Sequence, residues 1–222
     1  LEIKSSFIEK EVCLLHGVTS SGKTEIYIKL IEEYLSIGKQ VLYLLPEIAL
    51  TTQLVGRLRS YFGNKVAVFH SKYSNNERVE VWNQVVANSE KAQIVIGARS
   101  ALFLPFANLG CIIVDEEHEQ TYKQIDPAPR YHARDAAIVL ATFHKAKVLL
   151  GSATPSIETF FNASSGKFGL VSILERYGKV LMPAIELVDL KDKYFRKQMN
   201  GHFSDTLIEA ITNAIALGEQ VI

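Results

Sequence analysis

The chain has 222 residues, 48% hydrophobic and 22% charged, a composition that supports one substantial core and excludes a disordered protein. Its 24 Lys and Arg residues balance 24 Asp and Glu residues, so any nucleic-acid surface must be a local patch. No apolar run reaches membrane-spanning length and no signal-peptide pattern opens the sequence, so we expect a cytoplasmic protein.

Strand-length apolar runs alternate with helix-periodic segments along most of the chain. Because the runs are apolar on both faces, the rhythm predicts an α/β fold with a mostly parallel sheet covered by helices on each side. Gly38 is placed where a left-handed cap would close the first helix. The expected strands are 12–15, 41–45, 66–69, 94–96, 111–114 and 148–150, and the expected helices are 23–37, 50–62, 76–87 and 132–144.

The rhythm weakens after residue 166. Two further strands are expected at 170–174 and 185–190, then a polar connection over 191–200 and a helix over 204–217. Residues 219–222 have the pattern of another strand's beginning, and the chain opens on Leu1 rather than Met. We therefore expect a piece of a longer protein.

The segment 17–24, between the first strand and the first helix, fits G-x-x-x-x-G-K-[ST]. Two glycines let successive backbone N–H groups point at phosphate oxygens, and the following helix adds its positive end. Lys23 would bind the β- and γ-phosphates, and the Thr24 hydroxyl is a magnesium ligand. The phosphate-cradling residues are Gly17, Val18, Thr19, Ser20, Ser21, Gly22, Lys23 and Thr24.

Two adjacent carboxylates follow the apolar run 111–114. At the carboxyl edge of a parallel sheet, Asp115 would hold Mg²⁺ directly or through water, and Glu116 would polarise the attacking water. The alternative is a solvated acidic turn after a strand. The phosphate loop upstream favours the catalytic interpretation.

The sixth strand ends in Gly-Ser-Ala-Thr-Pro-Ser at 151–156. The hydroxyls of Ser152 and Thr154 suit a position beside the γ-phosphate, hydrogen-bonded to the carboxylates after Val114, which would couple the nucleotide state to the rest of the protein. The alternative is an ordinary turn followed by a helix cap at Ser156.

The two cysteines, Cys13 and Cys111, lie inside apolar strand-like runs. This placement suits buried reduced thiols better than a disulfide or a metal site. A reducing compartment follows from it.

Taken in order, the phosphate loop, L-L-P-E-I-A-L-T-x-Q at 44–53, I-G-A-R-S-A-L-F at 96–103, D-E-E-H at 115–118 and G-S-A-T-P-S at 151–156 resemble superfamily 2 helicases. More narrowly, they resemble the PriA-type helicases that restart stalled replication forks. The resemblance implies a RecA-like motor lobe over 1–190, then a connection and the truncated start of a second lobe over 191–222. It implies ATP and Mg²⁺ as cofactors, single-stranded or forked DNA as substrate, and primosome and single-strand-binding proteins as partners of the full-length protein.

The resemblance also assigns nucleic-acid contacts and coupling residues. The segments 46–51 and 97–100 resemble motifs Ia and Ib, which contact the backbone of a single strand, and loop N–H groups, a hydroxyl and an Arg suit phosphate. The segment 119–135 resembles an aromatic-rich loop that couples DNA binding to hydrolysis, and interleaved aromatics and cations suit stacked bases. The expected DNA contacts are Pro46, Glu47, Thr51, Arg99, Ser100, Tyr122, Lys123, Tyr131 and Arg134, and the expected coupling residues are His118, Ser152 and Thr154.

Alternatives stay open for some of these residues. Arg99 could be an ordinary surface cation, and the aromatics of 119–135 could be core anchors that pin a long loop. An RNA helicase, a duplex-DNA translocase or a nucleotide-gated interaction module would share the nucleotide motifs.

The chain departs from the family pattern at two positions. Ser20 stands where many relatives have Gly, a change that should leave phosphate binding intact. Ala98 stands where Thr is commoner, which removes one possible hydroxyl contact to DNA while keeping the backbone N–H. The adenine-recognition Gln, the 3′-end-binding domain, the zinc region and the lobe with the arginine finger are not in this sequence. Zinc is therefore expected only in the full-length protein.

Overall fold

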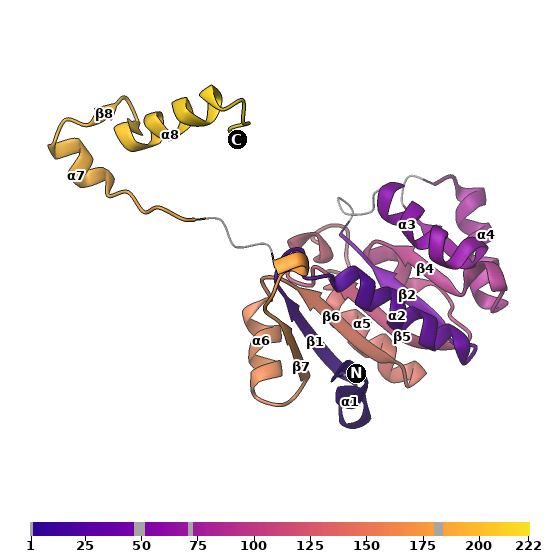
Figure 1. Cartoon of the computed structure of the whole chain (residues 1–222). Coiled ribbons are helices and arrows are strands. Elements are labelled where there is room, and N and C mark those ends of the chain that lie inside the picture. Colours follow the sequence, from indigo (N-terminus) through magenta and orange to yellow (C-terminus); the bar gives the residue numbers. More distant parts are fainter. Residues whose placement is uncertain (1, 47–51, 71–72, 180–183) are drawn as a thin grey trace. The chain divides into compact units, whose positions relative to one another are not determined.

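The computed structural model describes residues 2–46, 52–70, 73–179 and 184–222 (Figure 1). Two compact units make up the chain, Leu1–Val180 and Leu181–Ile222. The sequence placed a functional boundary at 190/191. Whether the second unit opens another motor lobe stays a prediction.

A seven-stranded sheet, parallel throughout, forms the centre of the larger unit. The six strands that the sequence indicated before residue 166 are all present, and 170–174 is confirmed as the edge strand β7. From one edge to the other they are β3 (Val66–Phe69), β4 (Ile94–Gly97), β2 (Gln40–Leu44), β5 (Leu109–Asp115), β6 (Lys147–Ser152), β1 (Val12–Gly17) and β7 (Gly169–Ile173).

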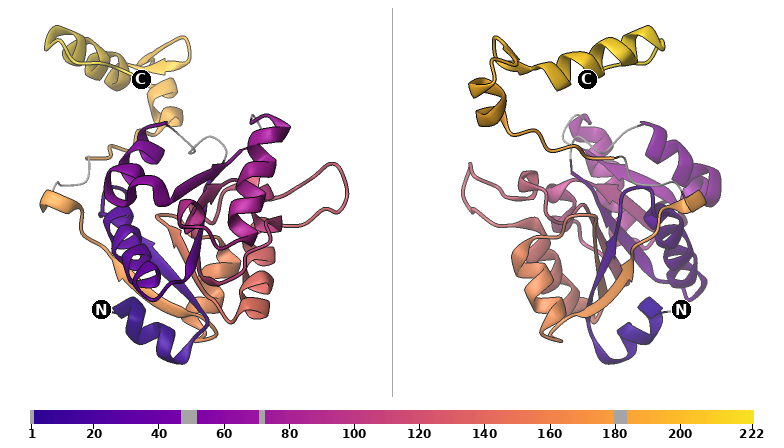
Figure 2. Two further views of the ribbon diagram at one scale, coloured as in Figure 1. Left: turned by 90° about the vertical axis from the view of Figure 1, so that its right-hand side faces the viewer. Right: turned by 60° about the vertical axis from the view of Figure 1, so that its left-hand side comes forward.

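Helices cover both faces of this sheet (Figure 2). Alternate side chains of the strands separate into two apolar clusters, one packed with helices α1, α2 and α3 and the other with α4, α5 and α6. This two-sided burial explains why the strands are apolar at successive positions. The helices are α1 (Glu2–Glu9), α2 (Lys23–Ser36), α3 (Thr52–Phe62), α4 (Asn75–Val86), α5 (Ala133–His144) and α6 (Ile157–Ser164).

Local sequence signals set several helix ends. Gly38 has φ 72°, and its N–H donates to Leu35 O after α2, as the left-handed cap predicts. Ser74 and Glu77 form a capping box at the start of α4. The sequence did not indicate α1 or the short 3-10 helices η2 (Gly63–Lys65), η3 (Glu90–Ala92), η4 (Arg99–Phe103), η5 (Gln120–Tyr122) and η6 (Tyr177–Lys179).

The strand register brings distant loops to one rim. His16 pairs with Ser152, and Asp115 pairs with Gly151. Because all strands run the same way, the segments that follow β1, β5 and β6 leave the sheet at a common carboxyl edge. This edge carries the motifs for phosphate, metal and coupling.

The smaller unit contains α7 (Leu190–Phe195), the two-stranded hairpin β8 (Met199–Asn200) and β9 (Phe203–Ser204), and α8 (Asp205–Ala216). The helix expected at 204–217 is confirmed, with Ser204 as its cap. The strands expected at 185–190 and 219–222 are wrong. Residues 184–189 and 219–222 have no regular secondary structure, and no neighbouring strand among the described residues pairs with them.

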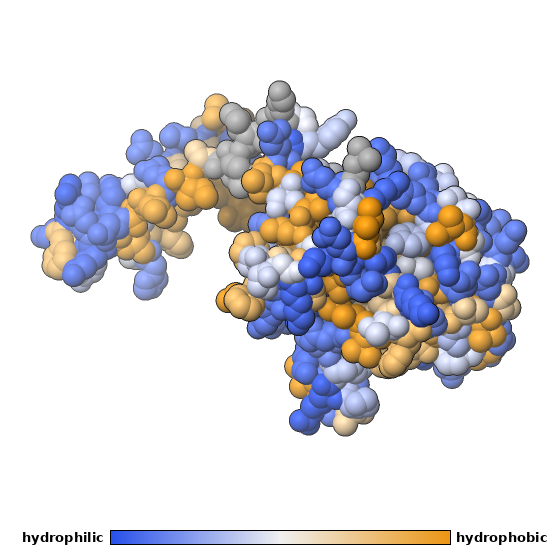
Figure 3. Space-filling view, turned by 90° about the horizontal axis from the view of Figure 1, so that it is seen from below, coloured by the Kyte–Doolittle hydropathy of each residue, from blue (hydrophilic) through white to orange (hydrophobic). Residues whose placement is uncertain are grey.

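On the face of the larger unit shown in Figure 3, small apolar patches lie among hydrophilic residues. Within the described part of the chain, no helix has both the length and the apolar character needed to cross a bilayer.

Candidate nucleotide and nucleic-acid site

The loop after β1 has the backbone shape of a phosphate cradle. Gly22 precedes α2 with φ 87°, a left-handed conformation that suits glycine. Ser20 adopts φ 63° in the same left-handed region, so a residue with a side chain occupies a backbone conformation that favours glycine. Lys23 Nζ donates to Gly17 O at 2.8 Å, which holds the ammonium group across the loop.

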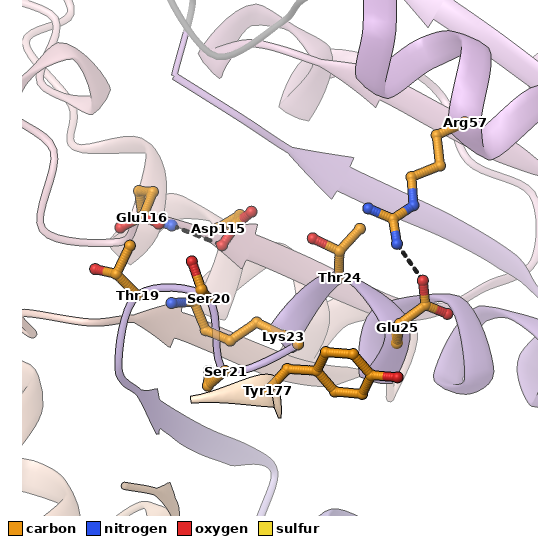
Figure 4. A pocket seen from close by; sticks show the side chains of 11 residues that line it. Thr19, Ser20, Ser21, Lys23, Thr24, Glu25, Arg57, Asp115, Glu116 and Tyr177 are labelled. Atoms are coloured by element: carbon orange, nitrogen blue, oxygen red, sulfur yellow. Dashed lines mark hydrogen bonds and ion pairs between the residues drawn. The ribbon is translucent and has the colours of Figure 1, made fainter. Parts of the chain in front are cut away.

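A cavity of about 740 Å³ opens beside this loop (Figure 4). It brings together the predicted residues Lys23, Thr24, Asp115 and Glu116, which come from two loops far apart in the sequence. The described lining consists of Thr19, Ser20, Ser21, Gly22, Lys23, Thr24, Glu25, Arg57, Asp115, Glu116 and Tyr177. Glu25, Arg57 and Tyr177 were not expected from the sequence.

Two buried tyrosines hold the Asp115 carboxylate. Tyr27 Oη donates to Oδ1 at 2.9 Å, and Tyr43 Oη donates to Oδ2 at 3.2 Å. Burial raises the pKa of Asp115, whereas these hydroxyls and Lys23 oppose the rise. A tyrosine inside an apolar strand needs a partner for its hydroxyl, and that is the signal by which Tyr43 could have been found.

Glu116 follows in a left-handed conformation, with φ 48°. Its backbone N–H donates to Asp115 Oδ1 at 3.1 Å, so the turn is tied to the preceding carboxylate. Burial and then the charge of Asp115 raise the pKa of Glu116. A strained residue with a raised pKa in a cavity fits a catalytic role.

The oxygen donors in the cavity fit magnesium. The Thr24 hydroxyl and the Asp115 carboxylate are hard ligands of the kind that Mg²⁺ takes together with nucleotide phosphates. When bound, the ion would neutralise phosphate charge.

The predicted coupling residues are in contact, with a different pairing from the one expected. Ser152 Oγ lies 2.8 Å from His118 Nδ1, and Thr154 Oγ1 lies 3.4 Å from His118 Nε2. The sequence interpretation paired these hydroxyls with the carboxylates. The structure corrects this, because the His118 imidazole lies between the Ser152 and Thr154 hydroxyls.

Glu117 is another residue of the site that the sequence did not indicate. Its side chain is completely buried. It accepts hydrogen bonds from the Ser156 N–H at 2.7 Å, the Thr159 hydroxyl at 2.8 Å and Arg134 Nη1 at 3.1 Å. A buried charge with several donors links the end of β5 to the starts of α5 and α6. The available signal was the second of two adjacent glutamates in one motif: Glu116 lines the cavity, whereas Glu117 does not.

The segment 119–132 projects from the body of the larger unit in both views of Figure 2. Lys123 and His132 form a bridge at its base, and Arg99 Nη1 donates to the carbonyls of Thr121 and Lys123 at 3.1 and 3.4 Å. Arg99 therefore ties the motif Ib loop to the aromatic-rich loop, which neither of its two expected roles included.

The other expected nucleic-acid residues differ in exposure. Pro46 is buried, and Ser100 and Tyr131 are half-buried, with the Tyr131 ring 5.1 Å from the Phe103 ring. Lys123 is exposed, and its Nζ donates to Arg130 O at 3.0 Å. Glu47 and Thr51 lie outside the described residues.

Tyr122 and Arg134 require correction. Tyr122 is 1% exposed and donates its hydroxyl to Asp115 O at 2.7 Å, so no face of its ring is open to a base. This residue fits the alternative of a core anchor. Arg134 is held by Glu117, Asp135 and Ser156, so its guanidinium is committed within the protein.

Both cysteines are free and buried, as the sequence indicated. Burial raises the pKa of Cys13 and Cys111. Neither thiol is suited to reactivity or to metal binding.

Comparison with known proteins identifies relatives with these motifs. The family described as DEAD/DEAH box helicase matches residues 2–162. The replication restart protein PriA of Bacillus subtilis is 46% identical over 214 residues, which is 96% of this chain and 26% of that protein. PriA of Rickettsia felis is 47% identical over 209 residues, 94% of this chain and 32% of that protein. The chain thus spans about a quarter to a third of these relatives.

Solved structures support the RecA-like fold. RecG bound to a three-way DNA junction superimposes with a TM-score of 0.55 at 20% identity, covering 84% of this chain and 24% of that one. The DUF1998 helicase MrfA bound to DNA gives a TM-score of 0.56 at 18% identity, and the match covers 78% of this chain and 26% of that chain. With the family match over residues 2–162, the chain belongs to the DEAD/DEAH box helicase family, whose domains bind ATP.

Proposed function

We propose that the chain is the first motor lobe of an ATP-dependent 3′-to-5′ DNA helicase that restarts stalled replication forks. One observation carries the proposal. Lys23, Thr24, Asp115 and Glu116 line a single cavity at the carboxyl edge of the sheet. The similarity to PriA proteins supports DNA and replication restart as the context.

The proposed chemistry is in-line attack of water on the γ-phosphate of Mg·ATP. Lys23 would neutralise charge on the transferring phosphoryl group, and Glu116, with its raised pKa, would orient and polarise the water. Thr24 and Asp115 would hold the metal. An arginine finger from a second lobe is typically worth a thousandfold or more, so this chain alone should hydrolyse ATP very slowly and unwind nothing.

The proposed DNA track follows the same edge of the sheet. Ser100, Lys123 and Tyr131 offer a hydroxyl, a cation and a partly exposed ring near the motif Ib loop. Arg99 would act by holding the aromatic-rich loop in place. Forked DNA, primosome proteins and single-strand-binding proteins would be partners of the longer protein.

Calorimetric titration with Mg·ATP tests the nucleotide site. Lys23→Ala should abolish measurable binding, because the β- and γ-phosphates lose their cation. Lys29→Ala is the matched control, because Lys29 is an exposed lysine on the same helix α2 and should bind as the wild type does. Equal binding by Lys23→Ala and the wild type would contradict the proposal.

Two rival functions remain distinguishable in the longer protein. An RNA helicase or duplex-DNA translocase would be stimulated by RNA or intact duplex rather than by single-stranded or branched DNA. A nucleotide-gated interaction module would keep its function in Glu116→Gln, whereas a motor would lose it. Turnover by this chain alone at the rate of the full protein would refute the requirement for a second lobe.

A further inference from the structure

Tyr177, in η6, presents a large ring at the nucleotide cavity without being part of any motif. The residue is 85% exposed, yet it lines the cavity together with Thr24, Glu25 and Arg57. An aromatic ring in a cavity that is also lined by a phosphate loop is suited to contact a flat apolar group of the ligand.

The backbone fixes this ring beside the phosphate loop. The Tyr177 N–H donates to Ser20 O at 2.9 Å, and the Val18 N–H donates to Ile173 O at 3.0 Å. The last residue of β7 and the turn that follows it are thereby attached to the loop at two points. Because both contacts join backbone atoms, replacing the Tyr177 side chain should leave them in place.

The cavity has two chemically different ends (Figure 4). Asp115, Glu116 and Thr19 lie at one end, Lys23 lies between, and Tyr177, Glu25 and Arg57 lie at the other. The carboxylates and Lys23 define where the terminal phosphates would sit. A nucleotide laid along the cavity would then extend its sugar and base toward Tyr177.

We infer that Tyr177 is the stacking platform for the nucleobase, an inference that rests on the proposed nucleotide-binding function. Stacking on a π-face accepts every base. Arg57 is already paired with Glu25, and Tyr61 Oη lies 3.5 Å from the same carboxylate. The described lining therefore supplies base affinity with little base selectivity, so ADP and GDP should bind with similar affinity.

The test compares ADP, GDP and inorganic triphosphate, each with magnesium, by calorimetric titration of the chain. Tyr177→Ala should weaken the binding of ADP and of GDP by between about fivefold and a hundredfold, which is the loss of affinity expected for one stacked base. Its affinity for triphosphate, which has no base, should stay as in the wild type. Tyr177→Phe keeps the ring and should bind all three normally. Tyr194→Ala removes a tyrosine that is 74% exposed in the smaller unit and serves as the control.

Each result decides between the inference and its alternatives. Unchanged ADP affinity in Tyr177→Ala overturns the stacking role while leaving the phosphate loop intact. An equal loss of ADP and triphosphate also overturns it, because the substitution would then act on the loop through its backbone. If the wild-type chain binds no triphosphate, the result refutes the proposed phosphate site, and the stacking role of Tyr177, which depends on that site, is refuted with it.

Discussion

Glu117 and Arg134 form an ion pair, with 3.1 Å between Oε2 and Nη1, that joins the end of β5 to the first turn of α5. The carboxylate is completely buried and the arginine side chain is 12% exposed. Because Arg134 also donates a hydrogen bond to Ser156, the pair connects three segments at the carboxyl edge of the sheet. The aromatic-rich loop and the G-S-A-T-P-S loop meet at this point, next to the carboxylates of the nucleotide cavity.

We expect Glu117→Ala to lower the free energy of unfolding by about 3–5 kcal/mol, because it leaves a partly buried arginine without its buried carboxylate partner. Asp135→Ala is the matched control. Asp135 pairs with the same arginine, at 2.9 Å, but its side chain is 62% exposed. Its loss should cost about 1 kcal/mol or less. Urea denaturation measures both changes in the free energy of unfolding. Similar losses in the two variants would contradict a special contribution from the buried Glu117 carboxylate.

The raised pKa of Asp115 predicts a pH-dependent stability. Because burial raises the pKa, the folded chain holds the proton more tightly than the unfolded chain. The stability that this protonation gives is present below the ordinary value of 3.8 and is lost as pH rises through the raised value. Asp115→Asn should therefore gain stability relative to the wild type as pH increases through that window. Urea denaturation over a pH series would show parallel curves if the prediction is wrong.

Tyr27→Phe should increase the loss of stability that accompanies a rise in pH through the raised pKa of Asp115. Its hydroxyl donates to Oδ1 and favours the ionised carboxylate, so removing it should raise the pKa of Asp115 further. Tyr122→Phe is the control, since it removes an equally buried phenol that donates to the Asp115 backbone carbonyl. Its curve should keep the wild-type slope, and a change as large as that of Tyr27→Phe would exclude a specific effect on the carboxylate.

The contact between Gly151 and Tyr27 offers a steric test of the same arrangement. A Cβ built at Gly151 would overlap the Tyr27 hydroxyl, whereas one at Gly56, inside α3, would meet nothing within 4 Å. Gly151→Ala should destabilise the chain by about 1–3 kcal/mol by displacing Tyr27. Gly56→Ala should stabilise it by about 0.5–1 kcal/mol. Thermal or urea unfolding distinguishes the two, and equal shifts would show that Tyr27 is not confined by Gly151.

Periodicity was enough to predict the central sheet, because strands buried on both faces are continuously apolar and the helices between them are amphipathic. The motif pattern placed Lys23, Thr24, Asp115 and Glu116 at one edge for the same topological reason. Exposure within a loop was not predictable: Tyr122 and Tyr131 look equivalent in sequence, but only Tyr122 enters the core. The apolar segments 185–190 and 219–222 resemble strands, and only the structure shows that no described strand pairs with them.

Ser20 gives a further test, because its left-handed backbone carries a side chain in the phosphate loop. A residue with a Cβ is disfavoured in this region by roughly 1–2 kcal/mol, partly offset by the greater freedom of glycine in the unfolded chain. Ser20→Gly should therefore stabilise the chain by up to about 1 kcal/mol and leave Mg·ATP affinity unchanged. Ser20→Ala removes the hydroxyl but keeps the Cβ, and it should give no gain. Equal stability of the two variants in urea would show that the hydroxyl, rather than the backbone conformation, determines the effect.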